Sequence, residues 1–230
     1  MILAELETFH SRAVAPTRRV AVGRCDLPLE PPMRPGAVLV AGVVGRYMEG
    51  LDDDSRDDLR LLIGQIARGE RIRQPRLRHR LQEDRIGLTR SRHRLVRRSG
   101  GRSAFEFSDR GGSAAQYVLG ALYAARSVSG PPRREIMGAV RRVLDWPGGS
   151  DAELLRFLDG FRAVSSETPA PHSWALGVLG LESLEGLAAG DVQKRFRRLV
   201  AAVHPDTGGA DGEAGERISD LVEARRILLS

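Results

Sequence analysis

The sequence has one cysteine, one lysine, few aromatic residues and no long apolar run, and these shortages exclude several classes of protein. Cys25, the single cysteine, excludes cysteine-built zinc modules and disulfide scaffolds and fits a reducing compartment. The longest apolar stretch, Gly36–Val44, is far shorter than the roughly 20 residues of a membrane-spanning helix. The initial segment MILAELETF has acids where a secretory signal would have basic residues. We therefore expect a mature cytoplasmic protein without a membrane anchor, a metal site or a cofactor.

Positive charge is concentrated in one part of the chain. All 36 basic residues except Lys194 are arginines, and residues 68–102 contain 13 of them against three acids. This basic block has a net charge of +10, whereas the 230-residue chain as a whole has +6, so the remainder is mildly acidic. Arginine clusters bind phosphate backbones by releasing counterions, which makes nucleic acid a candidate partner. The candidate contacts are Arg90, Arg92, Arg94, Arg97 and Arg98.

The periodicity of apolar residues predicts a mainly α fold in two domains. Helical patterns cover residues 36–49, 55–67, 113–126, 133–144 and 152–161, and Gly, Pro or Asp-rich breaks separate them. Short apolar segments on either side of Ser99-Gly100-Gly101 predict a small β-hairpin. Residues 164–171 have the composition of a linker. We expect a helix-rich domain over residues 1–163 and an all-α domain over 172–230.

The basic block allows two incompatible structures. Residues 87–96 fit a short helix capped by Thr89, and the hairpin would then be the wing of a winged helix-turn-helix. Alternatively, residues 92–98 form the first strand of the hairpin. The arginines could also be a solvated surface, or pair with the acids at positions 52–54 and 57–58. The block lacks the aromatic residues on which single-stranded bases stack.

The last sixty residues predict an antiparallel pair of amphipathic helices after a short apolar helix at residues 173–181. The first of the pair covers 191–203, where apolar positions form one stripe at a 3.6-residue period and Lys194, Arg197 and Arg198 occupy the opposite face, with Arg195 at its edge. The turn His204-Pro205-Asp206-Thr-Gly-Gly follows, and the last helix covers 213–229. Its expected apolar side consists of Ala214, Ile218, Leu221, Val222, Leu228 and Leu229. Arg225 falls within that side and therefore needs a partner.

These features resemble the J-domain family of DnaJ-like co-chaperones. The resemblance covers residues 173–230 and consists of the segment Trp174-Ala-Leu-Gly-Val-Leu-Gly-Leu, the basic helix, His-Pro-Asp and the final helix. The family's zinc-binding repeats and Gly/Phe-rich segment are missing. The sequence also departs from the family at Ala202 and Val203, where a lysine and a tyrosine are usual, and at Arg225, where tyrosine is usual.

The resemblance implies that this segment docks on a DnaK-type heat-shock chaperone and stimulates its ATP hydrolysis. It assigns the signature turn to His204, Pro205 and Asp206, and the basic docking face to Lys194, Arg195, Arg197 and Arg198. We therefore expect a co-chaperone rather than an enzyme, with an unknown client bound by the first domain. The alternative is a nucleic-acid-binding protein in which the J-domain serves only as a recruitment module.

Overall fold

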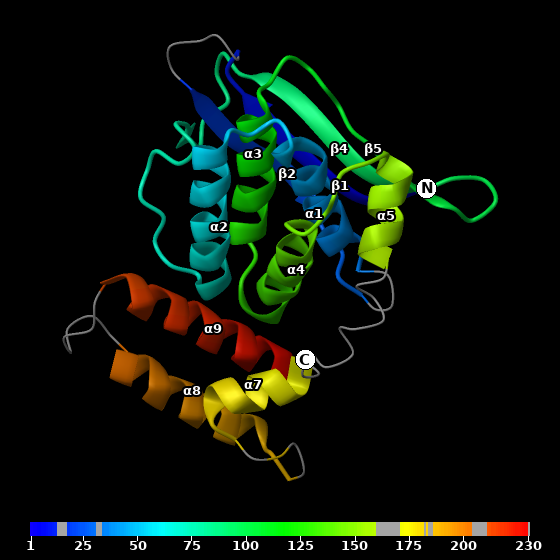
Figure 1. Ribbon diagram of the computed structural model, residues 1–230. Helices are drawn as coiled ribbons and strands as arrows, with labels where there is room; N and C mark the ends of the chain where they lie inside the picture. The colour runs from blue at the N-terminus through cyan, green and yellow to red at the C-terminus, as the bar shows by residue number, and fades with distance from the viewer. Residues whose placement is uncertain are drawn as a thin grey trace.

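The chain folds around a five-stranded mixed sheet, so the predicted mainly α class with a small hairpin is wrong (Figure 1). The computed structural model describes residues 1–12, 18–30, 34–159, 171–181, 183, 186–203 and 211–229. The strands are β1 (Ile2–His10), β2 (Arg19–Asp26), β3 (Arg80–Leu81), β4 (Thr89–Arg97) and β5 (Ser103–Glu106). Their order in the sheet is β3-β2-β1-β4-β5, and only the short β2–β3 pair is parallel.

Side chains of β1 and β4 point alternately to the face of the sheet that packs on the helices and to the opposite, open face. Along β1, Ala4, Leu6 and Thr8 are buried against the helices, whereas Glu5 and Glu7 lie on the opposite, open face, where Glu7 is only 8% exposed. Antiparallel pairing places Glu5 opposite Arg94 and Glu7 opposite Arg92. Opposite charges across a strand pair stabilise it, so these two pairs on the open face favour the pairing of β1 with β4.

Among the described residues, five helices complete the first unit: α1 (Pro35–Met48), α2 (Asp53–Arg68), α3 (Ala114–Arg126), α4 (Gly130–Val143) and α5 (Asp151–Asp159). The predicted helices agree with these to within a few residues. Helices α1 and α3 are apolar on almost every side because they lie between the sheet and the other helices (Figure 1). Asp52 caps the N-terminus of α2, and its carboxylate accepts a hydrogen bond from the Ser55 amide at 2.8 Å.

The C-terminal unit consists of α7 (Pro171–Leu179), α8 (Ala189–Val203) and α9 (Asp211–Leu229). It has a hydrophobic core of its own, separate from the core around the sheet. The core residues are Ala175, Leu179, Val192, Leu221, Ala224 and Ile227. Residues 164–170 of the expected linker lie outside the described residues, and Pro171 opens α7.

The two units meet where α9 approaches the beginning of α4 (Figure 1). The Arg134 guanidinium lies 5.0 Å from the centre of the Trp174 ring, which is a cation–π distance. Gly130 has φ +69°, and a Cβ there would lie 3.2 Å from both Trp174 and Glu223. Glycine therefore fits this position because it adopts a positive φ without strain and because it has no Cβ to crowd Trp174 and Glu223.

Within the described part of the chain, no helix is both long and apolar enough to cross a membrane.

Candidate functional sites

The cationic face expected on the second C-terminal helix is present on α8. Val192 is buried in the hairpin core, whereas Lys194, Arg197 and Arg198 are exposed. Figure 1 shows α8 on the side of the hairpin away from the sheet, with α9 between them. The three cations are therefore on an outer helix of the molecule.

Arg195 differs from its three cationic neighbours. Its Nε donates a 2.7 Å hydrogen bond to the backbone oxygen of Leu179, at the end of α7. Carbonyl groups in the last turn of a helix have no partner within the helix, so Arg195 caps α7. This hydrogen bond joins α8 to α7, a role that the assignment of Arg195 to the docking face did not include.

The apolar stripe of α9 is only partly the predicted one. Leu221 is buried as expected, but Val222 is 50% exposed and Leu229 is 41% exposed. Ala224 and Ile227 are buried instead. The Arg225 guanidinium lies 5.0 Å from the centre of the Phe196 ring on α8, so a ring face supplies the partner that this cation required.

The signature residues His204, Pro205 and Asp206 lie outside the described residues. Their sequence position is between the end of α8 at Val203 and the beginning of α9 at Asp211. The side chain of Ala214, from the expected α9 stripe, is likewise outside the described set.

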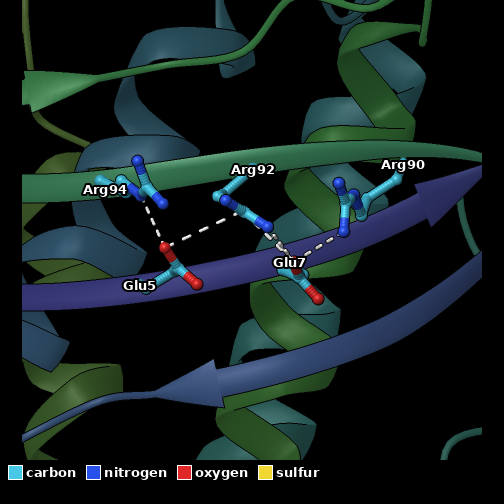
Figure 2. A network of polar contacts seen from close by, with 5 residues as sticks. All are labelled: Glu5, Glu7, Arg90, Arg92 and Arg94. Atoms are coloured by element: carbon cyan, nitrogen blue, oxygen red, sulfur yellow. Dashed lines mark hydrogen bonds and ion pairs between the residues drawn. The ribbon is translucent and has the colours of Figure 1, made fainter.

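The basic block folds as strand and loop, not as a recognition helix. Residues 89–97 form β4, which excludes the winged-helix interpretation and agrees with the alternative that placed a strand from Arg92. Arg90, Arg92 and Arg94 project from the open face of this strand (Figure 2). Arg97 is an odd number of residues from these three arginines, so it belongs to the other face of β4. Arg98 is exposed at the hairpin turn. The five candidate arginines therefore do not form one surface.

Two glutamates of β1 bind the three arginines into a ladder, here called the Arg–Glu ladder: Glu5, Glu7, Arg90, Arg92 and Arg94 (Figure 2). Arg92 donates to Glu7 at 2.8 Å, and Arg94 donates to Glu5 at 2.5 Å. Arg90 lies 3.4 Å from Glu7. Burial by itself would raise the pKa of Glu7, but the Arg92 hydrogen bond and the nearby positive charges hold it below its usual value. The ladder therefore places two carboxylates against three guanidinium groups, which offsets part of its positive charge.

Other arginines of the basic block pair with acids of the same unit, and one of these pairs, Arg76 with Asp58, involves the acidic segment that one interpretation of the sequence named. Arg76 donates to Asp58 of α2 at 2.9 Å and to Gln65 at 2.7 Å. Arg68 contacts Glu70. The cationic residues are thus distributed over α2, the following loop and β4, and part of their charge is neutralised locally.

A buried polar and aromatic cluster between the sheet and the helices was not expected from the sequence. It includes His10 on β1, His93 on β4, Tyr47 on α1 and Tyr117 on α3. The His10 Nε2 lies 2.9 Å from the Ser91 hydroxyl, and Tyr47 donates to Asp109 at 2.5 Å. Desolvation lowers the pKa of His93 to about 4, so this imidazole is neutral near pH 7.

This cluster does not form a reaction centre. Ser91 and His10 are each 1% exposed, so a substrate cannot reach them in this conformation. Among the described residues there is also no group of three or more His, Cys, Asp or Glu side chains that could hold a metal ion. In the sequence, the strand side of the cluster consists only of two pairs of polar residues two positions apart, Thr8 with His10 and Ser91 with His93, which is too short a pattern to predict the cluster.

Comparisons with protein-family models, with curated proteins and with solved structures found no match for this chain.

Proposed function

We propose that the protein is a cytoplasmic J-domain-type co-chaperone that binds a DnaK-type chaperone through α8 and the His204-Pro205-Asp206 turn. One observation carries the proposal: α8 exposes Lys194, Arg197 and Arg198, and it ends at Val203, immediately before His204-Pro205-Asp206 in the sequence. Cations on a helix attract an acidic partner surface and increase the rate of association. The chain supplies no catalytic group of its own in this proposal, because the partner hydrolyses the ATP.

The turn would act as a second contact. Asp206 follows a proline, which restricts the backbone and lowers the entropy lost when a carboxylate is held for an arginine of the partner. His204 precedes the proline and belongs to the same signature.

The decisive experiment measures ATP hydrolysis by a DnaK-type chaperone in the presence of the full chain. We expect stimulation that is abolished by His204→Gln and lowered at least tenfold by the triple change Lys194→Ala, Arg197→Ala and Arg198→Ala. Arg226→Ala is the matched control, because Arg226 is an exposed arginine that pairs with Glu223 on α9. Circular dichroism checks that each variant is folded. Undiminished stimulation by folded His204→Gln protein would refute the proposed mechanism.

We do not extend the proposal to nucleic acid. The helix that would have entered a groove is strand β4, and Glu5 and Glu7 offset much of the charge of its arginines. Because Glu5 and Glu7 offset part of this charge, fewer counterions would be released on phosphate binding than the +10 charge of the basic block suggests, and the nucleic-acid alternative stays a prediction.

A further inference from the structure

Half of strand β4 has no neighbouring strand on one side. β4 has nine residues, but β5 pairs only with its second part, from Arg94 to Arg97. Within the described part of the chain, no strand pairs with residues 89–93 on that side. We call this segment the free β4 edge. It spans about 17 Å, since an antiparallel strand rises roughly 3.4 Å per residue.

The backbone groups of the free β4 edge are oriented for pairing. The Arg98 N–H bonds to Arg102 across the β4–β5 hairpin, whereas the Arg97 N–H bonds to Met1 on the β1 side. Backbone direction alternates along a strand, so even-numbered residues of β4 direct their N–H and C=O groups toward the β5 side. Arg90 and Arg92 therefore present theirs to the unoccupied side.

Side chains of β4, α1 and α3 hold the chain after β5 away from this edge. The Ser108 N–H donates to Nδ1 of His93 at 3.4 Å, and Tyr47 of α1 donates to Asp109 at 2.5 Å. The hydroxyl of Tyr117 on α3 accepts hydrogen bonds from the Arg110 and Gly112 amides at 2.9 and 3.0 Å. These contacts direct residues 108–112 toward the helices and away from the sheet position beside residues 89–93.

A depression of about 520 Å³ lies along this edge. Its lining residues are Thr89, Arg90, Arg92, Arg94, Glu106, Phe107, Ser108 and Arg110. Glu5 and Glu7 hold the guanidiniums of the Arg–Glu ladder in place, but a guanidinium has five N–H donors and the ladder engages only one or two of each. The remaining donors are pre-oriented for a further carboxylate, which lowers the ordering cost of binding one.

We propose that the free β4 edge binds an acidic peptide in extended conformation as an added strand. The peptide backbone pairs with Arg90 and Arg92, and its carboxylates contact the arginines of the depression. Main-chain bonds supply affinity in this mode of recognition, and side chains at alternate positions supply specificity. The site belongs to the sheet unit and goes beyond the proposed function, which concerns the C-terminal hairpin.

The test is fluorescence anisotropy with the full chain and a fluorescein-labelled eight-residue peptide of alternating glutamate and valine. We expect saturable binding. A lysine–valine peptide of the same length and a backbone N-methylated acidic peptide should each bind at least tenfold more weakly, because the first reverses the charge and the second lacks N–H donors.

Two variants with the same charge change locate the site. Arg110→Glu should weaken binding at least tenfold, because Arg110 lines the depression but lies outside the strands and the Arg–Glu ladder. Arg102→Glu, at the exposed end of the β4–β5 hairpin, should change it less than twofold. Neither variant should alter stimulation of the chaperone ATPase. A failure of the peptide-binding proposal can therefore be distinguished from a failure of the co-chaperone proposal.

Several results would overturn the proposal. They are the absence of saturable binding, equal affinity for the basic or the N-methylated peptide, equal loss with both variants, and tighter binding of a single-stranded oligonucleotide of the same net charge. Absence of binding would mean that the arginines only protect an exposed strand edge from pairing with other copies.

Discussion

At the scale of single residues, the buried histidines make the stability of the fold depend on pH. His93 is fully buried and lies edge-on to the ring of Tyr117, with centroids 5.4 Å apart, and its Nε2 has no hydrogen-bond partner among the described residues. Desolvation likewise lowers the pKa of His10 and of His79. A histidine that is buried in its neutral form resists protonation, whereas the unfolded chain accepts the proton freely.

Acid should therefore destabilise the fold through His93. The unfolded imidazole titrates near pH 6.5 and the folded one near pH 4, so stability is complete above about pH 6.5 and is lost progressively as the pH falls toward 4. The loss is at most roughly 3–4 kcal/mol, because each tenfold difference in proton affinity between the two states corresponds to about 1.4 kcal/mol. His93→Gln should flatten this part of the curve in urea unfolding measured from pH 4 to 7. His172→Gln, at an exposed position, should leave it unchanged.

At the scale of elements, the packing of α1 on the sheet depends on a small residue at the contact. Gly42 faces β5, and a Cβ there would lie 2.4 Å from Cζ of Phe105. The Phe105 ring is stacked on Phe107 at 5.0 Å, so it has little room to move. Close-packed interiors do not absorb an added methyl group without displacing neighbours.

Substitution of two helical glycines should then have effects of opposite sign. Gly42→Ala should lower the free energy of unfolding by about 1–3 kcal/mol through overpacking. Gly64→Ala on α2 should raise it by about 0.5–1 kcal/mol, because alanine favours helix and its Cβ would meet only the mobile end of Arg68. Chemical denaturation measures both values, and a stabilising Gly42→Ala would show that α1 and β5 are packed less closely.

At the scale of the whole molecule, two hydrophobic cores are joined by a small contact. Arg134 of α4 and Trp174 of α7 provide its clearest interaction, and Gly130 allows Glu223 of α9 to approach. The contact involves α7 and α9 and not the cationic face of α8. In the docked arrangement, therefore, the proposed chaperone-binding helix stays accessible.

Loss of the Arg134 side chain should loosen this contact without unfolding either core. Arg134→Ala should increase hydrogen–deuterium exchange at the beginning of α4 and in the C-terminal half of α9, while the sheet stays protected. Arg141→Ala, an exposed change on the same helix, is the control. Unaltered exchange in the Arg134 variant would mean that other contacts hold the two units together.

The helices could be predicted from the sequence because each carries its own periodic apolar stripe, which depends only on local spacing. The same holds for α8: Val192 and Phe196 define one side and Lys194, Arg197 and Arg198 the other. The candidate docking face of the hairpin was therefore predictable, and what it binds stays a prediction.

The sheet could not be predicted in the same way. On β4, the helix-facing positions before Leu95 are Ser91 and His93, so the segment lacks the apolar alternation of a strand. These side chains are buried only because β1 pairs with β4 and brings His10 beside Ser91.

The partners of the arginines were likewise decided by tertiary structure. Charge content along the chain determined that residues 68–102 are basic, but Glu5 and Glu7 lie more than eighty residues away in sequence and meet Arg92 only across the folded sheet. The sequence by itself thus determined the helices and the amphipathic hairpin, whose patterns are local. The sheet, its Arg–Glu ladder and its free edge came only from contacts between distant segments, which leave no periodic signal in either segment alone.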